Sequence, residues 1–188
     1  MRIIAGRAKG RRLAAPPGLG TRPTAGRVRE ALFSVIMPRL AGANVLDAFA
    51  GSGALGLEAL SRGANKALFI EADAAALKVL RRNAEACRLP RAEILPGDAL
   101  RFFGRNKEPY DIVFLDPPYN TDLLARALKG LAGGTLAKGG LVVAETAAKD
   151  MLCPPAGFGV IKHSVYGDTA LYYLEAIDEQ DEISRQRQ

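Results

Sequence analysis

A carboxylate, two prolines and a tyrosine form the segment most suited to chemistry, Asp116-Pro117-Pro118-Tyr119, directly after the apolar run at 112–115. A short apolar run of this kind predicts a buried strand, so the four residues lie where that strand ends. The Asp116 carboxylate and the Pro117 carbonyl can accept the two hydrogens of an exocyclic amine on a planar base, and the fixed φ of proline holds both acceptors in place. The Tyr119 ring can stack on the base, a contact worth about 1 to 3 kcal/mol. These residue types favour transfer of a methyl group to an amine.

An exocyclic amine is a poor nucleophile because its lone pair is delocalised into the ring. Two hydrogen-bond acceptors would pull the nitrogen toward tetrahedral geometry and free the lone pair for in-line attack. Alignment of this kind contributes roughly 7 to 11 kcal/mol, and proton removal adds about 10²- to 10⁴-fold in rate. We therefore expect Asp116 to orient the amine first and to act as a base second. A base inside a duplex cannot present its amine to such a loop, so the target is expected to be unpaired or flipped out.

A glycine-rich turn connects a predicted strand at Val45-Leu46 to a predicted helix. Its glycines match the G-x-G-x-x-G pattern of dinucleotide sites; they are Gly51, Gly53 and Gly56, with Ser52 between the first two. Glu71, twenty residues after Gly51, lies at the end of the second predicted strand and can bind ribose hydroxyls. The pattern predicts a ligand that approaches the backbone closely and carries a ribose. By itself it fits a nicotinamide cofactor as well.

Two further acids favour S-adenosylmethionine over a nicotinamide cofactor. Asp47 ends the first predicted strand, where a carboxylate suits the cationic amino-acid end of S-adenosylmethionine better than a pyrophosphate. Asp98, followed by Ala99, ends the third strand and can accept a hydrogen bond from the adenine amino group. Together with Glu71, these acids would line one crevice at the carboxyl ends of three successive strands. The alternative is that Asp98 caps a helix and Asp47 only forms a turn; a helix cap is the role that we expect for Asp73.

The elements that would position these residues alternate between strands and helices. The apolar runs predict strands near 45–46, 67–70, 94–95, 112–115 and 141–143, and the helical spacings predict helices near 54–62, 73–87 and 122–132. Residues 160–165 and 170–174 predict an antiparallel hairpin at one edge, with a turn at 166–168. The expected fold class is therefore α/β, with a mostly parallel seven-stranded sheet and helices on both faces.

Three parts of the chain differ in composition. Residues 1–40 form a basic extension, a short hairpin or loop followed by a helix with a buried stripe at Val28, Ala31, Leu32, Val35 and Ile36. Thr24 is a suitable cap for that helix and Pro38 a suitable stop. Residues 41–177 form the catalytic domain, and the polar residues 178–188 are expected to be disordered.

The net charge of +6 is unevenly distributed along the chain. The first thirty residues hold eight basic residues against the single acid Glu30, and the basic ones are Arg2, Arg7, Lys9, Arg11, Arg12, Arg22, Arg27 and Arg29. The remaining residues sum to −1, with eighteen basic and nineteen acidic side chains. A basic head on a nearly neutral body is typical of a protein that binds nucleic-acid phosphates. The alternative interpretation is a solvated, solubilising surface.

The composition also bears on the setting of the protein. The two cysteines, Cys87 and Cys153, share no metal-ligand spacing, so neither a metal site nor a disulfide is expected. The chain has no apolar run of signal-peptide or membrane-span length. We therefore expect a soluble, cytoplasmic protein, and its size favours a monomer.

Taken together, the motifs resemble the bacterial ribosomal RNA small subunit methyltransferase D family. The matching segments are residues 1–6, 10–13, 21–24, 27–33, 51–64 and 166–169, so the resemblance covers nearly the whole chain. The amino-terminal segments discriminate best, because the glycine loop and Asp-Pro-Pro-Tyr occur in many amino methyltransferases. The resemblance implies a Rossmann-like class I methyltransferase fold, S-adenosylmethionine as cofactor and the 2-amino group of a guanine in 16S rRNA as target. It also implies that the basic head engages rRNA in an assembled or partly assembled small subunit.

Three other functions compete with this interpretation. A DNA adenine amino methyltransferase would use the same loop and cofactor, but it normally needs an extra region to read base edges in a duplex. A nicotinamide oxidoreductase would explain the glycines and Glu71 but not residues 116–119. A non-enzymatic RNA-binding or assembly protein would explain the basic head but not the acids of the crevice.

Overall fold

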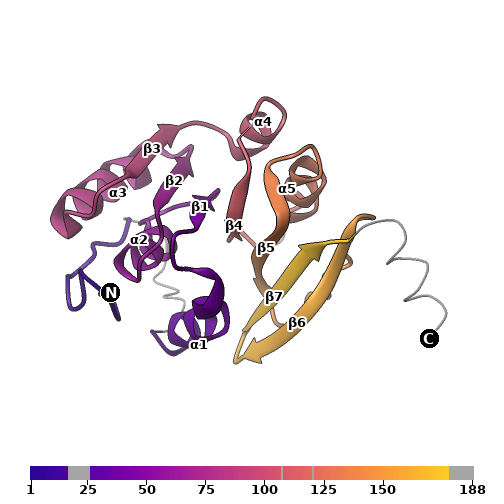
Figure 1. The fold of residues 1–188 in the computed structure, drawn as a ribbon, viewed down its shortest axis with the longest axis horizontal. Coiled ribbons are helices and arrows are strands. Elements are labelled where there is room, and N and C mark those ends of the chain that lie inside the picture. Colours follow the sequence, from indigo (N-terminus) through magenta and orange to yellow (C-terminus); the bar gives the residue numbers. More distant parts are fainter. Residues whose placement is uncertain (17–25, 107, 120, 178–188) are drawn as a thin grey trace.

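The computed structural model describes residues 1–16, 26–106, 108–119 and 121–177, and strands alternate with helices through most of it (Figure 1). The helices are α1 (Gly26–Ile36), η1 (Met37–Arg39, a 3-10 helix), α2 (Ala54–Ser61), α3 (Ala74–Cys87), α4 (Ala99–Phe103) and α5 (Leu123–Leu131). The strands are β1 (Asn44–Asp47), β2 (Lys66–Glu71), β3 (Ala92–Pro96), β4 (Tyr110–Leu115), β5 (Leu136–Ala147), β6 (Phe158–Tyr166) and β7 (Thr169–Ala176). Helix α4 was not predicted, because its five residues are too few for a helical period to be visible.

The strands form one sheet in the order β3-β2-β1-β4-β5-β7-β6. The first five strands in this order are parallel to one another, and β7 is antiparallel to both β5 and β6. From β1 the chain moves outward to β2 and β3 and then returns to β4 on the other side of β1, so the strand order reverses between β1 and β4. Ligands of open α/β sheets bind outside the carboxyl ends of the strands at such a switch point. The predicted mostly parallel seven-stranded sheet is confirmed.

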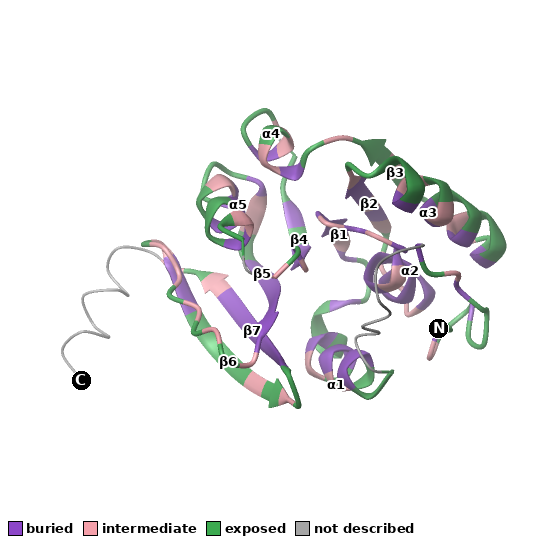
Figure 2. Cartoon of the chain, turned by 180° about the vertical axis from the view of Figure 1, so that it is seen from behind, coloured by how far each residue is buried: buried purple, intermediate pink, exposed green. Residues whose placement is uncertain are grey.

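The predicted hairpin is present, but its second strand joins the sheet. β7 pairs with β5, for example Val142 with Leu174, and β6 is left as the outermost strand. The reason lies in burial: residues 169–174 of β7 are all buried, whereas most of β6 is at least partly exposed (Figure 2). A strand that is apolar on both faces belongs inside a sheet, and a strand with an exposed face can form the edge.

Helices cover both faces of the sheet and enclose two hydrophobic cores. On one face, α1, α2 and α3 contribute Leu32, Leu57 and Leu80 to a core with the inner side of the strands. On the other face, α4 and α5 contribute Phe103 and Leu128 to a second core. The two layers hold the carboxyl ends of the central strands at a common edge (Figure 1).

The buried stripe of α1 is rotated relative to the one predicted. The buried residues are Val28, Arg29, Leu32, Phe33 and Ile36, so Arg29 and Phe33 lie inside where Ala31 and Val35 were expected. Arg29, Leu32, Phe33 and Ile36 keep the i, i+3, i+4, i+7 spacing of one helix face. The predicted stripe was wrong because Arg29 occupies one of the buried positions, and an arginine is not counted as apolar in a hydrophobic pattern.

The N-terminal arm (residues 1–14) packs against α2 through a buried carboxylate. The Glu58 side chain is fully buried and accepts hydrogen bonds from the backbone nitrogens of Ile4 and Ala5, at 2.7 and 3.0 Å. It also forms a salt bridge with Arg62 Nε at 2.7 Å. A buried carboxylate is tolerated when its oxygens are paired in this way. The arm is therefore fixed to the body of the molecule and shares its core.

Some predictions fall on residues outside the described part of the chain. They concern Arg22, the expected cap Thr24 and the expected disordered tail at 178–188. Across the described ranges, no helix is long and apolar enough to cross a membrane. Within the same ranges, no three His, Cys, Asp or Glu residues are grouped so that they could hold a metal ion.

Candidate active site

Four predicted site acids lie at the carboxyl edge of the sheet. Asp47 is the last residue of β1, Glu71 the last of β2, and Asp116 directly follows β4. Asp98 follows the end of β3 by two residues. Because β3, β2, β1 and β4 are neighbours in the sheet, the four acids form one row along this edge. The predicted row of acids at the ends of successive strands is therefore present.

Asp47 is a buried carboxyl group. Its residue is 2% exposed, and Oδ2 accepts a hydrogen bond from the Gly56 backbone nitrogen at 3.0 Å. Burial raises the pKa of Asp47 to about 7; the hydrogen bond from Gly56 opposes the rise, and the charge of Glu71 adds to it. A cation placed beside this group would favour its ionised form. Asp47 thus has the environment expected of a partner for a cationic ligand.

Glu71 fixes the backbone of the crevice with both of its oxygens. Oε2 accepts from the Gly51 backbone nitrogen at 2.7 Å, and Oε1 accepts from the Asp73 backbone nitrogen at 2.8 Å. Each carboxylate oxygen has a further lone pair available for a ligand hydroxyl. Glu71 therefore joins the end of β2 to the glycine loop.

The glycine loop adopts a conformation that requires glycine. Gly51 and Gly53 have φ values of +53° and +79°, which L side chains rarely adopt. A Cβ on Gly53 would also lie 2.3 Å from Leu80 Cδ1, whereas one on Gly51 would meet no atom within 4 Å. The space at Gly51 is thus open for a ligand, and Gly53 is needed for packing of the loop against α3.

Ser52, between these glycines, is hydrogen-bonded to Asn83 of α3, a residue that was not predicted from the sequence. Asn83 Nδ2 donates to the Ser52 carbonyl oxygen at 2.8 Å. The same side chain bonds Ala14 of the N-terminal arm twice, at 2.9 and 3.0 Å. Asn83 was not predicted because a single polar residue on a helix gives no signal until its face is known to be buried.

The acids Asp73 and Asp98 both cap helices. Asp73 accepts from the Ala76 backbone nitrogen at 2.7 Å at the start of α3, as predicted. Asp98 Oδ1 accepts from the Arg101 backbone nitrogen at 2.9 Å at the start of α4, so the alternative considered for it is also present. Asp98 is exposed and Ala99 is buried. Contact of Asp98 or Ala99 with adenine stays a prediction.

The loop after β4 combines a buried proline with two half-buried functional groups. Pro117 is buried, whereas Asp116 and Tyr119 are partly exposed toward the carboxyl edge. The Tyr119 hydroxyl donates a hydrogen bond to Glu145 Oε1 at 2.7 Å. Burial raises the pKa of the Tyr119 phenol, and the hydrogen bond to Glu145 and the charges of Glu145 and Asp116 raise it further. The phenol therefore stays neutral and keeps its ring in one orientation.

Glu145 is a second site residue that was not predicted from the sequence. It lies within β5, is 6% exposed, and is level with Asp116 because Leu115 pairs with Ala144 one position earlier. The available signal was an acid at the end of an otherwise apolar run, Leu141-Val142-Val143-Ala144-Glu145. A buried carboxylate so placed is costly unless it has partners, and here its partner is the tyrosine of the loop.

Comparison with known proteins shows which family the chain belongs to. The family model described as "Conserved hypothetical protein 95" matches residues 1–175. Ribosomal RNA small subunit methyltransferase D of Escherichia coli (strain K12) is 40% identical over 185 residues, which is 96% of this chain and 93% of that protein. The chain belongs to this family.

Solved structures of other proteins have the same fold. The putative methyltransferase yhhF from Escherichia coli has a TM-score of 0.85 at 39% identity, and the match covers 94% of this chain and 99% of that one. A putative methyltransferase complexed with SAH has a TM-score of 0.65 at 18% identity over 80% of this chain and 48% of that one, which shows the shared fold. The predicted class I methyltransferase fold is confirmed. The SAH bound in the second of these structures agrees with the predicted cofactor, S-adenosylmethionine.

The residues of the crevice fit that cofactor. The buried carboxyl group at the end of β1, whose pKa is raised, suits a cation. The open space at Gly51 suits a chain that approaches the backbone closely, and the carboxylate at the end of β2 suits a ribose. In this family member, Asp47, Gly51 and Glu71 would therefore hold S-adenosylmethionine.

The basic residues of the N-terminal segment divide into an exposed and a buried set. The exposed ones are Arg2, Arg7, Lys9, Arg11, Arg12 and Arg27. Arg29 was predicted to bind RNA, but it is 4% exposed and Nη2 donates to the Arg2 carbonyl oxygen at 2.7 Å. Burial lowers the pKa of its guanidinium. Arg29 therefore ties the arm to α1 and is not available to RNA.

Proposed function

We propose that this protein transfers a methyl group from S-adenosylmethionine to the exocyclic 2-amino group of a guanine in small-subunit (16S) ribosomal RNA. The observation that carries the proposal is the loop of residues 116–119, which follows β4 beside Asp47 and has its tyrosine fixed by Glu145. The relative named ribosomal RNA small subunit methyltransferase D supports rRNA as the substrate. The guanine amine rests on the family resemblance of the motifs.

The loop orients the amine. The Asp116 carboxylate and the Pro117 carbonyl accept its two hydrogens, so the nitrogen lone pair turns out of conjugation and toward the crevice. Pro117 is buried and has a fixed φ, which keeps its carbonyl from moving during the reaction. Asp116 then takes up the proton that the amine loses when it becomes substituted. Most of the rate gain comes from alignment, for which the general range is about 7 to 11 kcal/mol.

Tyr119 and Glu145 hold the base. The hydroxyl is bonded to Glu145, so the ring stays in one orientation and offers a flat surface for stacking. This division separates two tasks, because the ring binds the base while Asp116 and Pro117 act on its amine. Holding the tyrosine in advance lowers the conformational cost of binding.

The crevice residues prepare the other reactant. Bound S-adenosylmethionine supplies an electrophilic sulfonium methyl group. Asp47 balances positive charge near β1, and Glu71 holds the Gly51 backbone that closes one side of the crevice. Because Asp47 and Phe114 are paired in neighbouring strands, Asp47 lies next to the strand that delivers Asp116. This register brings donor and acceptor together.

The exposed basic residues of the N-terminal arm suit a substrate recognised by shape and phosphate contact. Structured RNA in an assembled or partly assembled subunit presents such phosphates around an unpaired base. A duplex-reading methyltransferase needs an element for the grooves, and the arm is fixed flat against α2. A nicotinamide cofactor is disfavoured because its pyrophosphate would lie beside the Asp47 carboxylate, and the two negative charges would repel each other.

Nucleoside mass spectrometry tests the proposal. The purified protein is incubated with S-adenosylmethionine and either 16S rRNA or small subunits that lack the modification, and the RNA is digested to nucleosides. We expect 2-methylguanosine, in higher yield from particles than from naked RNA. Methyladenine in a parallel DNA reaction, with no methylguanine in rRNA, would overturn the proposal.

A further inference from the structure

The described structure has a second basic surface, outside the basic N-terminal segment. It is not apparent from the net charge of the residues after position 30, which sum to −1. Residues 78–91 hold five basic side chains against the single acid Glu85; the basic ones are Lys78, Arg81, Arg82, Arg88 and Arg91. The other residues after position 30 hold thirteen basic and eighteen acidic side chains. The residues after position 30 are therefore nearly neutral as a whole because the basic segment 78–91 balances the net negative charge of the others.

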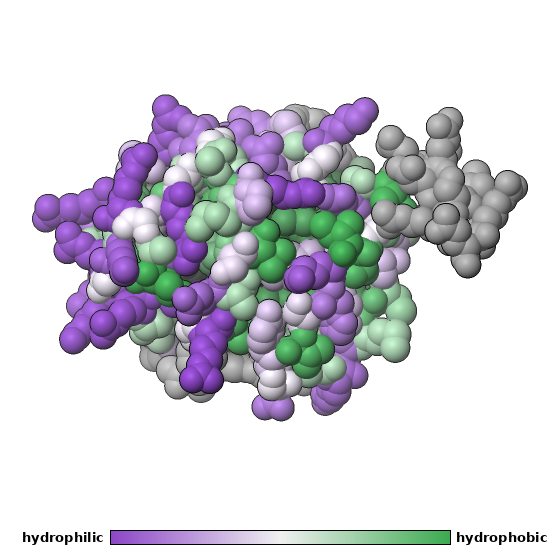
Figure 3. All heavy atoms as spheres, turned by 60° about the horizontal axis from the view of Figure 1, so that its bottom comes forward, coloured by the Kyte–Doolittle hydropathy of each residue, from purple (hydrophilic) through white to green (hydrophobic). Residues whose placement is uncertain are grey.

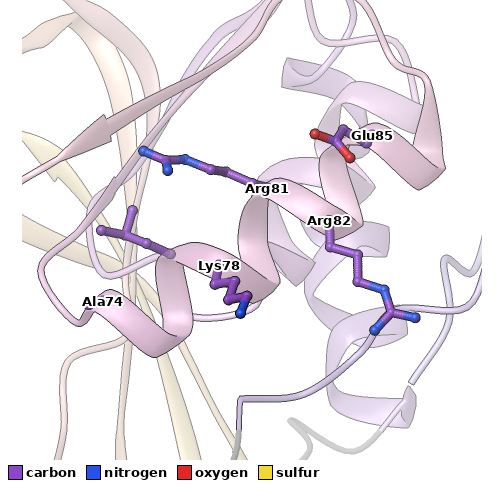
Figure 4. A pocket seen from close by; sticks show the side chains of 6 residues that line it. Ala74, Lys78, Arg81, Arg82 and Glu85 are labelled. Carbon is purple, nitrogen blue, oxygen red and sulfur yellow. The ribbon is translucent and has the colours of Figure 1, made fainter.

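The basic residues share the outer face of α3. Lys78, Arg81, Arg82 and Glu85 follow the i, i+3, i+4, i+7 spacing and are all exposed, opposite the buried face that carries Leu80 and Asn83. They line a shallow surface hollow together with Ala74 and Leu77 (Figure 4). The long side chains of Arg81 and Arg82 extend in different directions from the helix, so the charge covers a broad area.

This surface continues into the N-terminal arm. Asn83, on the same helix, bonds Ala14 of the arm, and the charge of Arg11 opposes the burial that raises the pKa of the Cys87 thiol at the end of α3. Arg2 and Arg12 pair directly across the arm. Long hydrophilic side chains project from the side of the molecule that carries α3 and the arm (Figure 3). Arm and helix thus form one surface.

The charges on this surface lack carboxylate partners among the described residues. Among the described residues, the basic partners in salt bridges are Arg39, Arg62, Lys66 and Arg126. None of these four lies on the outer face of α3 or on the arm. Like charges directly opposite each other, such as Arg2 and Arg12, destabilise a strand pair. Glu85 is the one acid on this helix face, and it forms no salt bridge with the basic side chains among the described residues. A surface with this excess of unbridged positive charge suits an external polyanion.

We propose that the outer face of α3, through Lys78, Arg81 and Arg82, is a second contact surface for the phosphate backbone of the RNA substrate. It extends the surface of the arm on one side of the molecule and positions the RNA across the carboxyl edge. This inference rests on the proposed function, since it names where the same substrate is held. Arg11 and Arg12 of the arm join the helix to the rest of the RNA-binding surface.

The test compares two matched triple variants. The first is Lys78→Gln, Arg81→Gln and Arg82→Gln. The control is Lys129→Gln, Arg105→Gln and Arg126→Gln, which removes one lysine and two arginines that are exposed on the opposite side of the sheet, near α4 and α5. Binding to an in-vitro transcript of 16S rRNA is measured at several salt concentrations, and cofactor affinity and thermal stability are measured for both.

We expect the α3 variant to bind the transcript about tenfold or more weakly, and its slope of log affinity against log salt to fall by about 2 to 3, because each phosphate contact contributes roughly 0.7 to 0.9. Cofactor affinity and melting temperature should not change. The control variant should bind like the original protein. Equal losses in both variants, or an unchanged slope in the α3 variant, would overturn the inference.

The outcome is separable from that of the proposed function. If the original protein methylates 16S rRNA and the α3 variant binds it with unchanged affinity, the surface is wrong and the function stands. If the original protein forms no methylguanosine, the proposed function fails whatever the binding data show.

Discussion

At the ends of β1, β2 and β3 the carboxylates accept hydrogen bonds from backbone nitrogens, whereas at β4 and β5 they are associated with a side chain. Asp47 accepts from Gly56, and Glu71 from Gly51 and Asp73. Glu145, in contrast, accepts from the Tyr119 hydroxyl. We call the first group, with Asp98, the cofactor half and the second, with residues 116–119, the base half.

The difference indicates two ways of preparing a site. In the cofactor half the acids accept hydrogen bonds from the main chain, so the glycine loop is held in place before a ligand binds. In the base half one acid fixes an aromatic ring and another lies beside it, so the side chains are set for the reacting group. Substitutions in the cofactor half should therefore change cofactor affinity, and substitutions in the base half should change turnover.

The largest expected effect is that of Asp116→Ala. Loss of the carboxylate removes an acceptor for the amine, so kcat should fall by about 10²- to 10⁴-fold, the range of a positioned acid–base group. Cofactor affinity, measured by titration calorimetry, should stay nearly unchanged. Asp116→Asn keeps an acceptor oxygen and should retain more activity than the alanine variant. Weakened cofactor binding in Asp116→Ala would break the comparison by assigning Asp116 to the cofactor half.

The next effect is that of the pair Tyr119 and Glu145. A hydrogen bond to a charged group contributes about 1.5 to 3 kcal/mol, so Glu145→Ala and Tyr119→Phe should each lower kcat roughly 10- to 100-fold. The double variant should lose little more than either single one, because both changes remove the same interaction. Glu145→Gln serves as the control that keeps an acceptor oxygen. Additive losses in single-turnover assays would show that the two residues act separately.

The smallest effect concerns Asp47 and pH. Its pKa of about 7 means that a cationic ligand meets a largely protonated group below that pH and a carboxylate above it. Cofactor affinity should therefore rise about tenfold between pH 6 and 8 in the original protein. Asp47→Asn, which keeps an acceptor for Gly56, should show a flat profile in calorimetry. An unchanged pH profile in this variant would remove Asp47 from the cofactor half.

The same pKa fixes the sign of a stability effect. The folded protein binds the Asp47 proton more tightly than the unfolded chain, whose ordinary value is 3.8, so the unfolding free energy contributed by this group falls as pH rises from about 4 to 7. The asparagine variant should lack this contribution in denaturant titrations at the two pH values. Cofactor binding opposes the loss, because it favours the carboxylate.

Sequence periodicity predicted the strands well and the helix faces less well. The apolar runs placed all seven strands because each run is bounded by polar or glycine-rich segments. The stripe of α1 was misplaced because Arg29 is buried against the arm, and no local rule predicts a buried arginine. Asn83 on α3 was not predicted because it is also a polar residue on a buried helix face.

By itself the sequence determined the order of elements and the residues at the strand ends, among them Asp47, Glu71 and Asp116, since both follow from local patterns of apolar and polar residues. Only the tertiary structure decided which strands are neighbours, and with that the pairing of Glu145 with Tyr119, the burial of Arg29 and the joining of the arm to α3. These features depend on contacts between residues far apart in the chain. No local periodicity records such contacts, because they form only when the sheet and its helices pack.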